Sequence, residues 1–233
     1  MRNKSLIIAL ALSIGSFSAL TAQSSVSSDV HIAKGKKVNR AVSSVSGDVY
    51  VGSGARITAA VSSVSGDIEI GAKARTKEVN SVSGNISIGK SAETTAVESV
   101  SGSIQLYENS EVDGDMETVS GEVNCDSGSE TTGNINTVSG DIELDDSRLR
   151  GSIETVSGDI SLFNGTMVDG DIVIDNTNSW VIGVSSKQKI IIDMNSVVRG
   201  SIRVKEPNSR VIVYLANGGK VKGEIINAEV RKQ

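Results

Sequence analysis

The chain has 233 residues, a formal net charge of −5, one cysteine, one proline and 24 glycines, and only 3% of its residues are aromatic. A single cysteine excludes an intramolecular disulfide, and the shortage of aromatic residues argues against a globular core of ordinary width. The composition indicates a narrow core of Val and Ile, and the acidic balance gives no support to nucleic-acid binding.

The first 22 residues have the order of a secretory signal peptide. Arg2 and Lys4 precede an apolar run over 6–14, and small residues lead to an expected cleavage after Ala22. The alternative is a membrane anchor, but the apolar run is too short to span a bilayer. We therefore expect an exported protein, periplasmic or extracellular at the cell surface, with no transmembrane span after cleavage.

A Val-Ser-Gly phrase then recurs with a nearly constant period. A degenerate copy over 25–32 has Ser28 in the place of the glycine, so eight units occupy 23–172. Internal periods of this length are typical of stacked architectures in which each unit buries its apolar face against its neighbours. The repeated glycines are Gly47, Gly66, Gly84, Gly102, Gly121, Gly140 and Gly158, and their spacing is always 18 or 19.

Within each unit the pattern has period two. In SVSGDIEI, residues 63–70, Val64 is expected to share the inward face with the glycine and the isoleucines, while Ser65, Asp67 and Glu69 face outward. The glycine is expected either where a Cβ would collide with the core or where a corner needs positive φ, and the sequence leaves both open.

A second phrase, an aliphatic residue followed by x-Gly-x and Ile or Met, leads into the later units at 112–116, 149–153 and 168–172. Two strand segments with turns in each period predict one coil of an all-β, single-stranded parallel β-solenoid, or β-helix. The handedness is left open, with right-handed winding favoured.

Residues 173–233 break this period. The second phrase returns at 197–204 and 220–225, with a spacing of 23. We predict irregular C-terminal coils and a cap of the same solenoid, because the end of a solenoid exposes unpaired strand edges that need cover. Trp180 is expected to pack in this cap.

The serial SGDI-type phrases resemble those of a bacterial adhesin-like β-solenoid family of exported or envelope-associated proteins. The phrases VDGDIVI (168–174), VVRGSIRV (197–204) and KVKGEI (220–225) are also similar, more remotely, to those of bactofilins, which are polymer-forming β-helical scaffolds. The resemblance covers about 25–229. It implies the solenoid fold, an envelope role and self-association, and it brings no catalytic residue.

His31 and Cys125 are the residues to weigh for catalysis. Hexapeptide acyltransferases carry a catalytic His on a β-solenoid, but His31 lies at the extreme end of the repeat with outward parity. Cys125 shares the inward parity of Val123, with no His or Asn partner in view. We predict no enzyme, and the least favoured alternative is a carbohydrate-active β-helix enzyme, which needs a groove of clustered acids and basic residues.

Asp48, Asp67, Asp141 and Asp159 directly follow the repeated glycine. Because stacked coils lie about 4.8 Å apart, these side chains are expected to form a surface column. A solvated ladder is the favoured interpretation, and calcium held between the carboxylates is the alternative, although the calcium-binding nonapeptide pattern with its double glycine is missing. We otherwise predict no cofactor.

Hydroxyl groups flank each Val of the Val-Ser-Gly phrase. The preceding row contains Ser44, Ser63, Ser81, Ser99, Thr118, Thr137 and Thr155. These residues and the serines that follow each Val are expected to face outward together. The two rows would then form one strip of (Ser/Thr)-x-Ser, similar to the double rows of ice-binding solenoids. The following row contains Ser46, Ser65, Ser83, Ser101, Ser120, Ser139 and Ser157.

Charge is segmented along the repeat. Residues 108–159 hold 14 acids and two basic residues, whereas 23–107 and 160–233 are mildly basic. This pattern either solubilises the surface or biases assembly and attracts cations.

Together these features predict an exported, non-enzymatic β-solenoid with an adhesin-like or structural, self-associating role in the cell envelope. We expect homo-oligomers through solenoid edges, or contact with a cell-envelope or surface polysaccharide. The alternative is a ligand- or ice-binding protein that uses its hydroxyl ladder.

Overall fold

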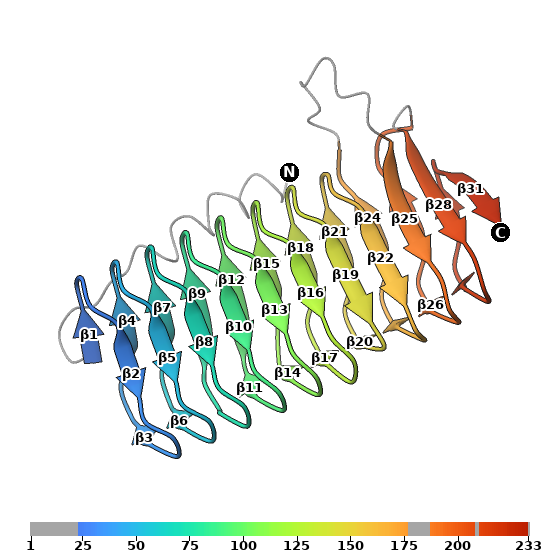
Figure 1. Cartoon of the computed structure of the whole chain (residues 1–233). Helices are drawn as coiled ribbons and strands as arrows, with labels where there is room; N and C mark the ends of the chain where they lie inside the picture. Colours follow the sequence, from blue (N-terminus) through green and yellow to red (C-terminus); the bar gives the residue numbers. More distant parts are fainter. Residues whose placement is uncertain (1–22, 177–186, 208–209, 233) are drawn as a thin grey trace.

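The computed structural model describes residues 23–176, 187–207 and 210–232, so the predicted signal peptide and Trp180 lie outside the described residues. The described residues form about ten turns of a β-solenoid without a helix, and all their strand pairs are parallel. In Figure 1 the coils succeed one another along a rod, from β1 in blue to β31 in red. The predicted all-β parallel solenoid is confirmed.

Three sheets run along the rod. Within the described residues, sheet A has 11 strands: β1 (Gln23–Ser25), β4 (Val42–Ser44), β7 (Val61–Ser63), β9 (Glu78–Ser81), β12 (Ala96–Ser99), β15 (Met116–Thr118), β18 (Ile135–Thr137), β21 (Ile153–Thr155), β24 (Ile172–Ile174), β27 (Ile202–Val204) and β30 (Ile225–Ile226). Sheet B also has 11 there: β2 (Val30–Ile32), β5 (Val49–Val51), β8 (Ile68–Ile70), β10 (Ile86–Ile88), β13 (Ile104–Leu106), β16 (Val123–Cys125), β19 (Ile142–Asp145), β22 (Ile160–Phe163), β25 (Gln188–Ile192), β28 (Val211–Leu215) and β31 (Glu229–Lys232).

Sheet C is the narrowest, because each of its strands has two residues. Its main part contains β11 (Glu93–Thr94), β14 (Glu111–Val112), β17 (Glu130–Thr131), β20 (Arg148–Leu149), β23 (Met167–Val168), β26 (Val197–Val198) and β29 (Lys220–Val221). The pair β3 (Lys37–Val38) and β6 (Arg56–Ile57) continues it toward the N-terminal end, since Arg75 bridges both Arg56 and Glu93.

Each coil therefore passes through sheets A, B and C in turn, and we number the coils by their sheet A strand, from coil 1 at β1 to coil 7 at β18. The sequence predicts two strand segments per coil, and the structure corrects this to three. A strand of two residues is too short to show an alternating pattern, which explains why sheet C was missed.

The core consists of columns of aliphatic side chains, in which residues of successive coils lie in register along the rod. On sheet A, Val42 pairs with Val61 and Val61 with Val79, so the register of the strands follows the period of the sequence. These three side chains have 0% exposure. β-branched residues suit such a wall because they pack well on a pleated surface.

The repeated phrase forms the corner between sheets A and B. In coil 3, β7 ends at Ser63, residues 64–66 bend, and β8 begins at Ile68. Ser63 is fully buried and Val64 is half-exposed, so the predicted inward position of Val64 is wrong. The bend interrupts the alternation that the sequence pattern assumes to be continuous.

The glycine of this corner is required by the neighbouring coil. A Cβ on Gly66 would come under 3.0 Å from the carbonyl group of Gly47, and a Cβ on Gly84 would meet Gly66 in the same way. Of the seven repeated glycines, only Gly158 has a positive φ, at +116°. Close approach of backbone to backbone, rather than a collision with the core, explains the repeat.

The corner between sheets B and C uses a left-handed residue in successive coils. Gly35 and Gly54 have φ of 67° and 68°, and Lys73, Ser91 and Asn109 follow with φ of 58°, 56° and 56°. The chain thus turns here by backbone conformation.

The strands after residue 174 continue the same three sheets with longer coils. Ile172 pairs with Ile202, and Ile202 pairs with Ile225, so more of the chain separates paired strands here than in the regular coils. β25 and β28 each have five residues, so sheet B widens at this end of the rod.

Candidate functional site

The two predicted hydroxyl rows differ in burial at the corner between sheets A and B. The row at Ser46, Ser65, Ser83, Ser101, Ser120, Ser139 and Ser157 is exposed, as predicted. The preceding row is buried, so the prediction of a paired outward strip is wrong. A single exposed serine row beside half-exposed valines lacks the double row on which the ice-binding alternative depends.

The buried row has a structural task. Ser63 Oγ accepts a hydrogen bond from Gly66 N–H at 3.0 Å, and Ser81 Oγ accepts one from Gly84 N–H at 2.9 Å. The same bond forms at Ser44, Ser99 and Thr118. The hydroxyl thereby satisfies a backbone donor at the bend, which is the reason a polar residue lies inside the wall.

The predicted aspartates form a column that holds backbone amides. Asp48 Oδ1 accepts the N–H of Asp67 at 2.9 Å, and Asp67 Oδ1 accepts the N–H of Asn85 at 2.7 Å. Asp141 Oδ1 accepts the N–H of Asp159 at 2.7 Å, and Asp159 in turn accepts the N–H of Lys189. Between these carboxylate links, the amide oxygen of Asn85 accepts the N–H of Ser103 and the hydroxyl of Ser103 accepts the N–H of Glu122, so polar side chains of several kinds connect neighbouring coils.

A second column of this kind, which was not predicted from the sequence, lies at the corner between sheets C and A. Asp115 Oδ1 accepts the N–H of Asn134 at 2.6 Å, and Asn134 Oδ1 accepts the N–H of Ser152 at 2.9 Å. Asp171 and Ser201 continue the column. The signal was present, because Asp, Asn or Ser follows the glycine of the second phrase in these coils.

The aspartate columns are spread along the rod rather than gathered. In the part of the chain that the structure describes, no group of three or more His, Cys, Asp or Glu side chains could hold a metal ion. One oxygen of Asp48, Asp67, Asp141 and Asp159 already accepts a backbone hydrogen bond. Calcium remains a prediction.

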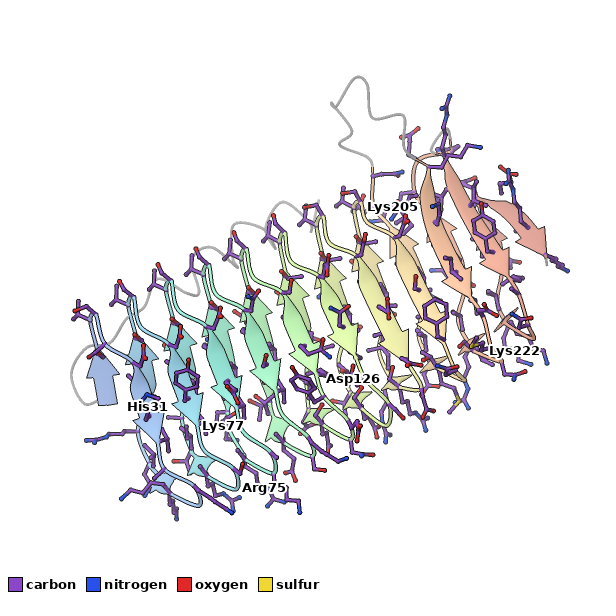
Figure 2. The ribbon with its side chains drawn as sticks, viewed as in Figure 1. His31, Arg75, Lys77, Asp126, Lys205 and Lys222 are labelled. Atoms are coloured by element: carbon purple, nitrogen blue, oxygen red, sulfur yellow. The ribbon has the colours of Figure 1, made fainter. Side chains whose placement is uncertain are left out.

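Cys125 and His31 lie where the parity of the sequence indicated. Cys125 is buried on sheet B, and this burial raises the pKa of its thiol to about 12. A thiol with so high a pKa is a poor nucleophile at neutral pH. His31 is exposed in coil 1 (Figure 2), and its ring stacks on that of Tyr50 with the ring centroids 4.8 Å apart.

The outer face of sheet B carries a depression of about 450 Å³ across coils 2–5. Tyr50, Glu69, Ser87 and Gln105 are consecutive partners in register on this face. Ser87 has the smallest side chain of the four, and Tyr50 and Tyr107 stand at the two ends of the depression. Glu69 and Ser87 therefore lie between the two aromatic side chains.

Other polar groups complete the depression. Asp67, Asn85 and Lys90 line the depression together with Glu69 and Ser87. The Tyr50 hydroxyl donates to Asp48 Oδ2 at 2.9 Å, and this bond, followed by the negative charge of Asp48, raises the pKa of Tyr50. Aromatic faces beside carboxylate, amide and hydroxyl groups can stack on an apolar ring face and exchange hydrogen bonds with its hydroxyls.

The described residues include no helix with the length and apolar character that a membrane crossing requires. A family model described as Toastrack DUF4097 matches residues 76–212, which is more than half of the chain. A search of the curated proteins and a search of the solved structures gave no match. The finer resemblance to adhesin-like proteins or bactofilins remains a prediction.

Proposed function

The chain belongs to the Toastrack DUF4097 family, a family of unknown function, and on that premise we propose that the protein is an exported, non-enzymatic β-solenoid scaffold that binds a cell-envelope polysaccharide along sheet B. The observation that carries this proposal is the depression between Tyr50 and Tyr107. Export rests on the signal-peptide pattern of residues 1–22, and the envelope role rests on the sequence resemblance.

The geometry of the depression suits an extended chain of sugars. Tyr50 and Gln105 are three coils apart, which is about 14 Å at the spacing of neighbouring strands. Tyr107 lies two residues beyond Gln105, just past the end of β13. A ligand along the rod axis would contact one aromatic ring at each end and the polar residues between them.

The rod itself contributes rigidity. Each coil is held to the next by parallel strand pairing, and the aspartate column adds side-chain bonds between the coils that carry the depression, so the surface groups keep fixed spacings. A rigid surface loses little conformational freedom on binding. Several weak contacts along one polymer then add up, which is the mechanism expected of an adhesin-like scaffold.

The test is polysaccharide binding by residues 23–233. Affinity is measured by calorimetry or on an array of neutral and acidic envelope polysaccharides. Tyr107→Ala is expected to weaken binding about threefold to tenfold, the value of one aromatic contact. Tyr214→Ala is the matched control, because Tyr214 faces outward on the same sheet far from the depression. Failure of the wild-type chain to bind, or equal losses in both variants, would contradict the proposal.

End-to-end self-association is a second candidate function. Among the described residues β31 pairs with β28 alone, and all four residues of β31 are exposed, so its second edge has no partner strand there. Open edges are templates for strand addition. Sedimentation of residues 23–233, with and without calcium, should show polymers that lengthen with concentration, and a protein that never grows beyond a small closed oligomer would exclude this candidate.

A further inference from the structure

The outward positions of sheet C form two adjoining blocks of opposite charge. Lys37 pairs in register with Arg56, and Arg56 with Arg75, in coils 1 to 3. Arg75 then pairs with Glu93, and the column continues through Glu111 and Glu130 in coils 4 to 6. Over coils 1 to 6 the column therefore reads three cations followed by three anions, and Arg148 follows Glu130 in coil 7.

The turns beside sheet C carry the same charges as the column. Lys34, Lys36, Lys73 and Lys77 are exposed next to the basic block. In Figure 2, Arg75 and Lys77 project from the blue-to-cyan part of the rod.

The acidic block is flanked in the corresponding way. Glu108, Asp113 and Asp146 are exposed beside Glu111 and Glu130. Ion pairs within the molecule partly offset these charges, because Arg75 pairs with Glu93 where the two blocks meet, Lys90 with Glu108 and Arg150 with Glu130. The excess charge of each block still has one sign.

This order of charges is unfavourable within one molecule. Like charges directly opposite each other on neighbouring strands destabilise a sheet, and opposite charges stabilise it. Arg56 has a cation in register on both sides, and Glu111 has an anion on both sides. Alternating signs would suit the isolated rod better.

We propose that this face binds a second copy of the chain in an antiparallel, side-by-side dimer. The twofold axis lies in the interface between coils 3 and 4, perpendicular to the rod. Arg75, Arg56 and Lys37 of one copy then meet Glu93, Glu111 and Glu130 of the other. Because both blocks share the spacing of the coils, all three rows match at once, and symmetry repeats them, as in an isologous interface.

A second copy fits this face better than an anionic polymer. A polyanion would be attracted to coils 1–3 and repelled by the acids of coils 4–6 on the same face. A second copy complements both blocks in sign, number and spacing. The contact is distinct from end-to-end growth through β31 and does not depend on polysaccharide binding along sheet B.

Exposed ion pairs are individually weak and are screened by salt, so the dimer is expected to be salt-sensitive. Sedimentation velocity on residues 23–233 should show dimers at about 0.01 M ionic strength, where the Debye length is about 30 Å, and monomers at about 1 M, where it is about 3 Å. Association through this face alone should stop at the dimer, because the two faces close on each other.

Arg56→Glu is the discriminating variant. It places an anion between two cations, so thermal stability of the monomer is expected to hold or rise, while the dimer dissociation constant increases about tenfold or more because two rows become repulsive. Combining Arg56→Glu with Glu111→Arg exchanges the two signs and should restore the dimer. Lys222→Glu is the control, since Lys222 lies in the far coils and changes the net charge equally (Figure 2).

Three outcomes would overturn the proposal. One is a wild-type protein that stays monomeric at low salt. Another is equal weakening by Arg56→Glu and Lys222→Glu, which would report net charge alone, or a double variant that does not dimerise although its net charge equals that of the wild type. The third is a monomeric protein whose basic block binds heparin, with binding lost in Arg56→Glu, which would assign the block to a polyanion.

Discussion

Two corners of the coil both use glycine, and they use it for different reasons. At the corner between sheets A and B, Gly66 and Gly84 lie so close to the preceding coil that a Cβ would come under 3.0 Å from its backbone. At the corner between sheets B and C, Gly35 and Gly54 have positive φ and no heavy atom within 4 Å of a Cβ. The corner between sheets A and B, which we call the close corner, depends on proximity. The corner between sheets B and C, which we call the open corner, depends on conformation.

This difference explains which corner tolerates variation. At the corner between sheets B and C, Lys73, Ser91 and Asn109 replace glycine at positive φ. At the corner between sheets A and B, the glycine recurs through seven units. A conformational penalty of about 1 kcal/mol can be borne by one residue, whereas a backbone collision displaces the whole neighbouring coil.

The largest expected effect comes from adding a Cβ to a glycine of the close corner. A Cβ on Gly102 would come under 3.0 Å from the carbonyl group of Gly84, so Gly102→Ala should lower the free energy of unfolding by at least about 4 kcal/mol. Gly54→Ala is the matched control at the open corner, with an expected loss of about 1 kcal/mol. Urea unfolding followed by circular dichroism measures both, and equal losses would show that the two corners do not differ.

A smaller effect tests the buried hydroxyl of the close corner. Ser81→Ala leaves the Gly84 N–H without its acceptor inside the wall, so the expected loss is about 2 kcal/mol. Ser83→Ala, in the exposed row, should change stability by about 0.5 kcal/mol or less. Thermal melts of the two variants give the comparison, and a neutral Ser81→Ala would mean that the hydroxyl is dispensable at the bend.

The sequence could predict the coil length, the parallel stacking, the burial of Cys125 and the outward aspartate column, because each follows from a long repeat with period-two alternation. It could not predict the full burial of Ser63 or the partial exposure of Val64, since the bend at 64–66 resets the alternation. Charge segmentation was visible in the sequence, but only the register of Arg56 with Arg75 and of Glu93 with Glu111 shows that the blocks share one face.

Removing a left-handed non-glycine residue from the open corner should raise the free energy of unfolding. Ser91 has a φ of 56°, and Ser91→Gly relieves the left-handed strain while adding backbone freedom to the unfolded chain. We expect a net gain of about 0.5 kcal/mol in the free energy of unfolding. A loss on urea unfolding would indicate that the serine side chain contributes a contact that outweighs the strain.

The smallest expected effect concerns Glu117, whose carboxylate is crowded by the neighbouring coils on the wall of sheet A. Glu117 pairs in register with Glu98 on this sheet and is half-buried. Burial, and then the charges of Glu98 and Asp115, raise the pKa of Glu117, although the amide of Asn136 opposes the shift. A raised pKa in the folded state means that the ionised carboxylate destabilises the fold at neutral pH.

Glu117→Gln should therefore stabilise the protein at neutral pH by about 0.5 kcal/mol or less, because the side chain is partly solvated. The gain should shrink as the pH falls through the raised pKa and vanish below the ordinary glutamate pKa of about 4.3, where both side chains are neutral. Asn136→Ala removes the amide that favours the charged form, so it should lower stability more at neutral than at acidic pH. Urea unfolding at neutral and acidic pH measures these differences. A gain from Glu117→Gln that does not change with pH would contradict the conclusion that burial and the neighbouring charges penalise the ionised form of Glu117.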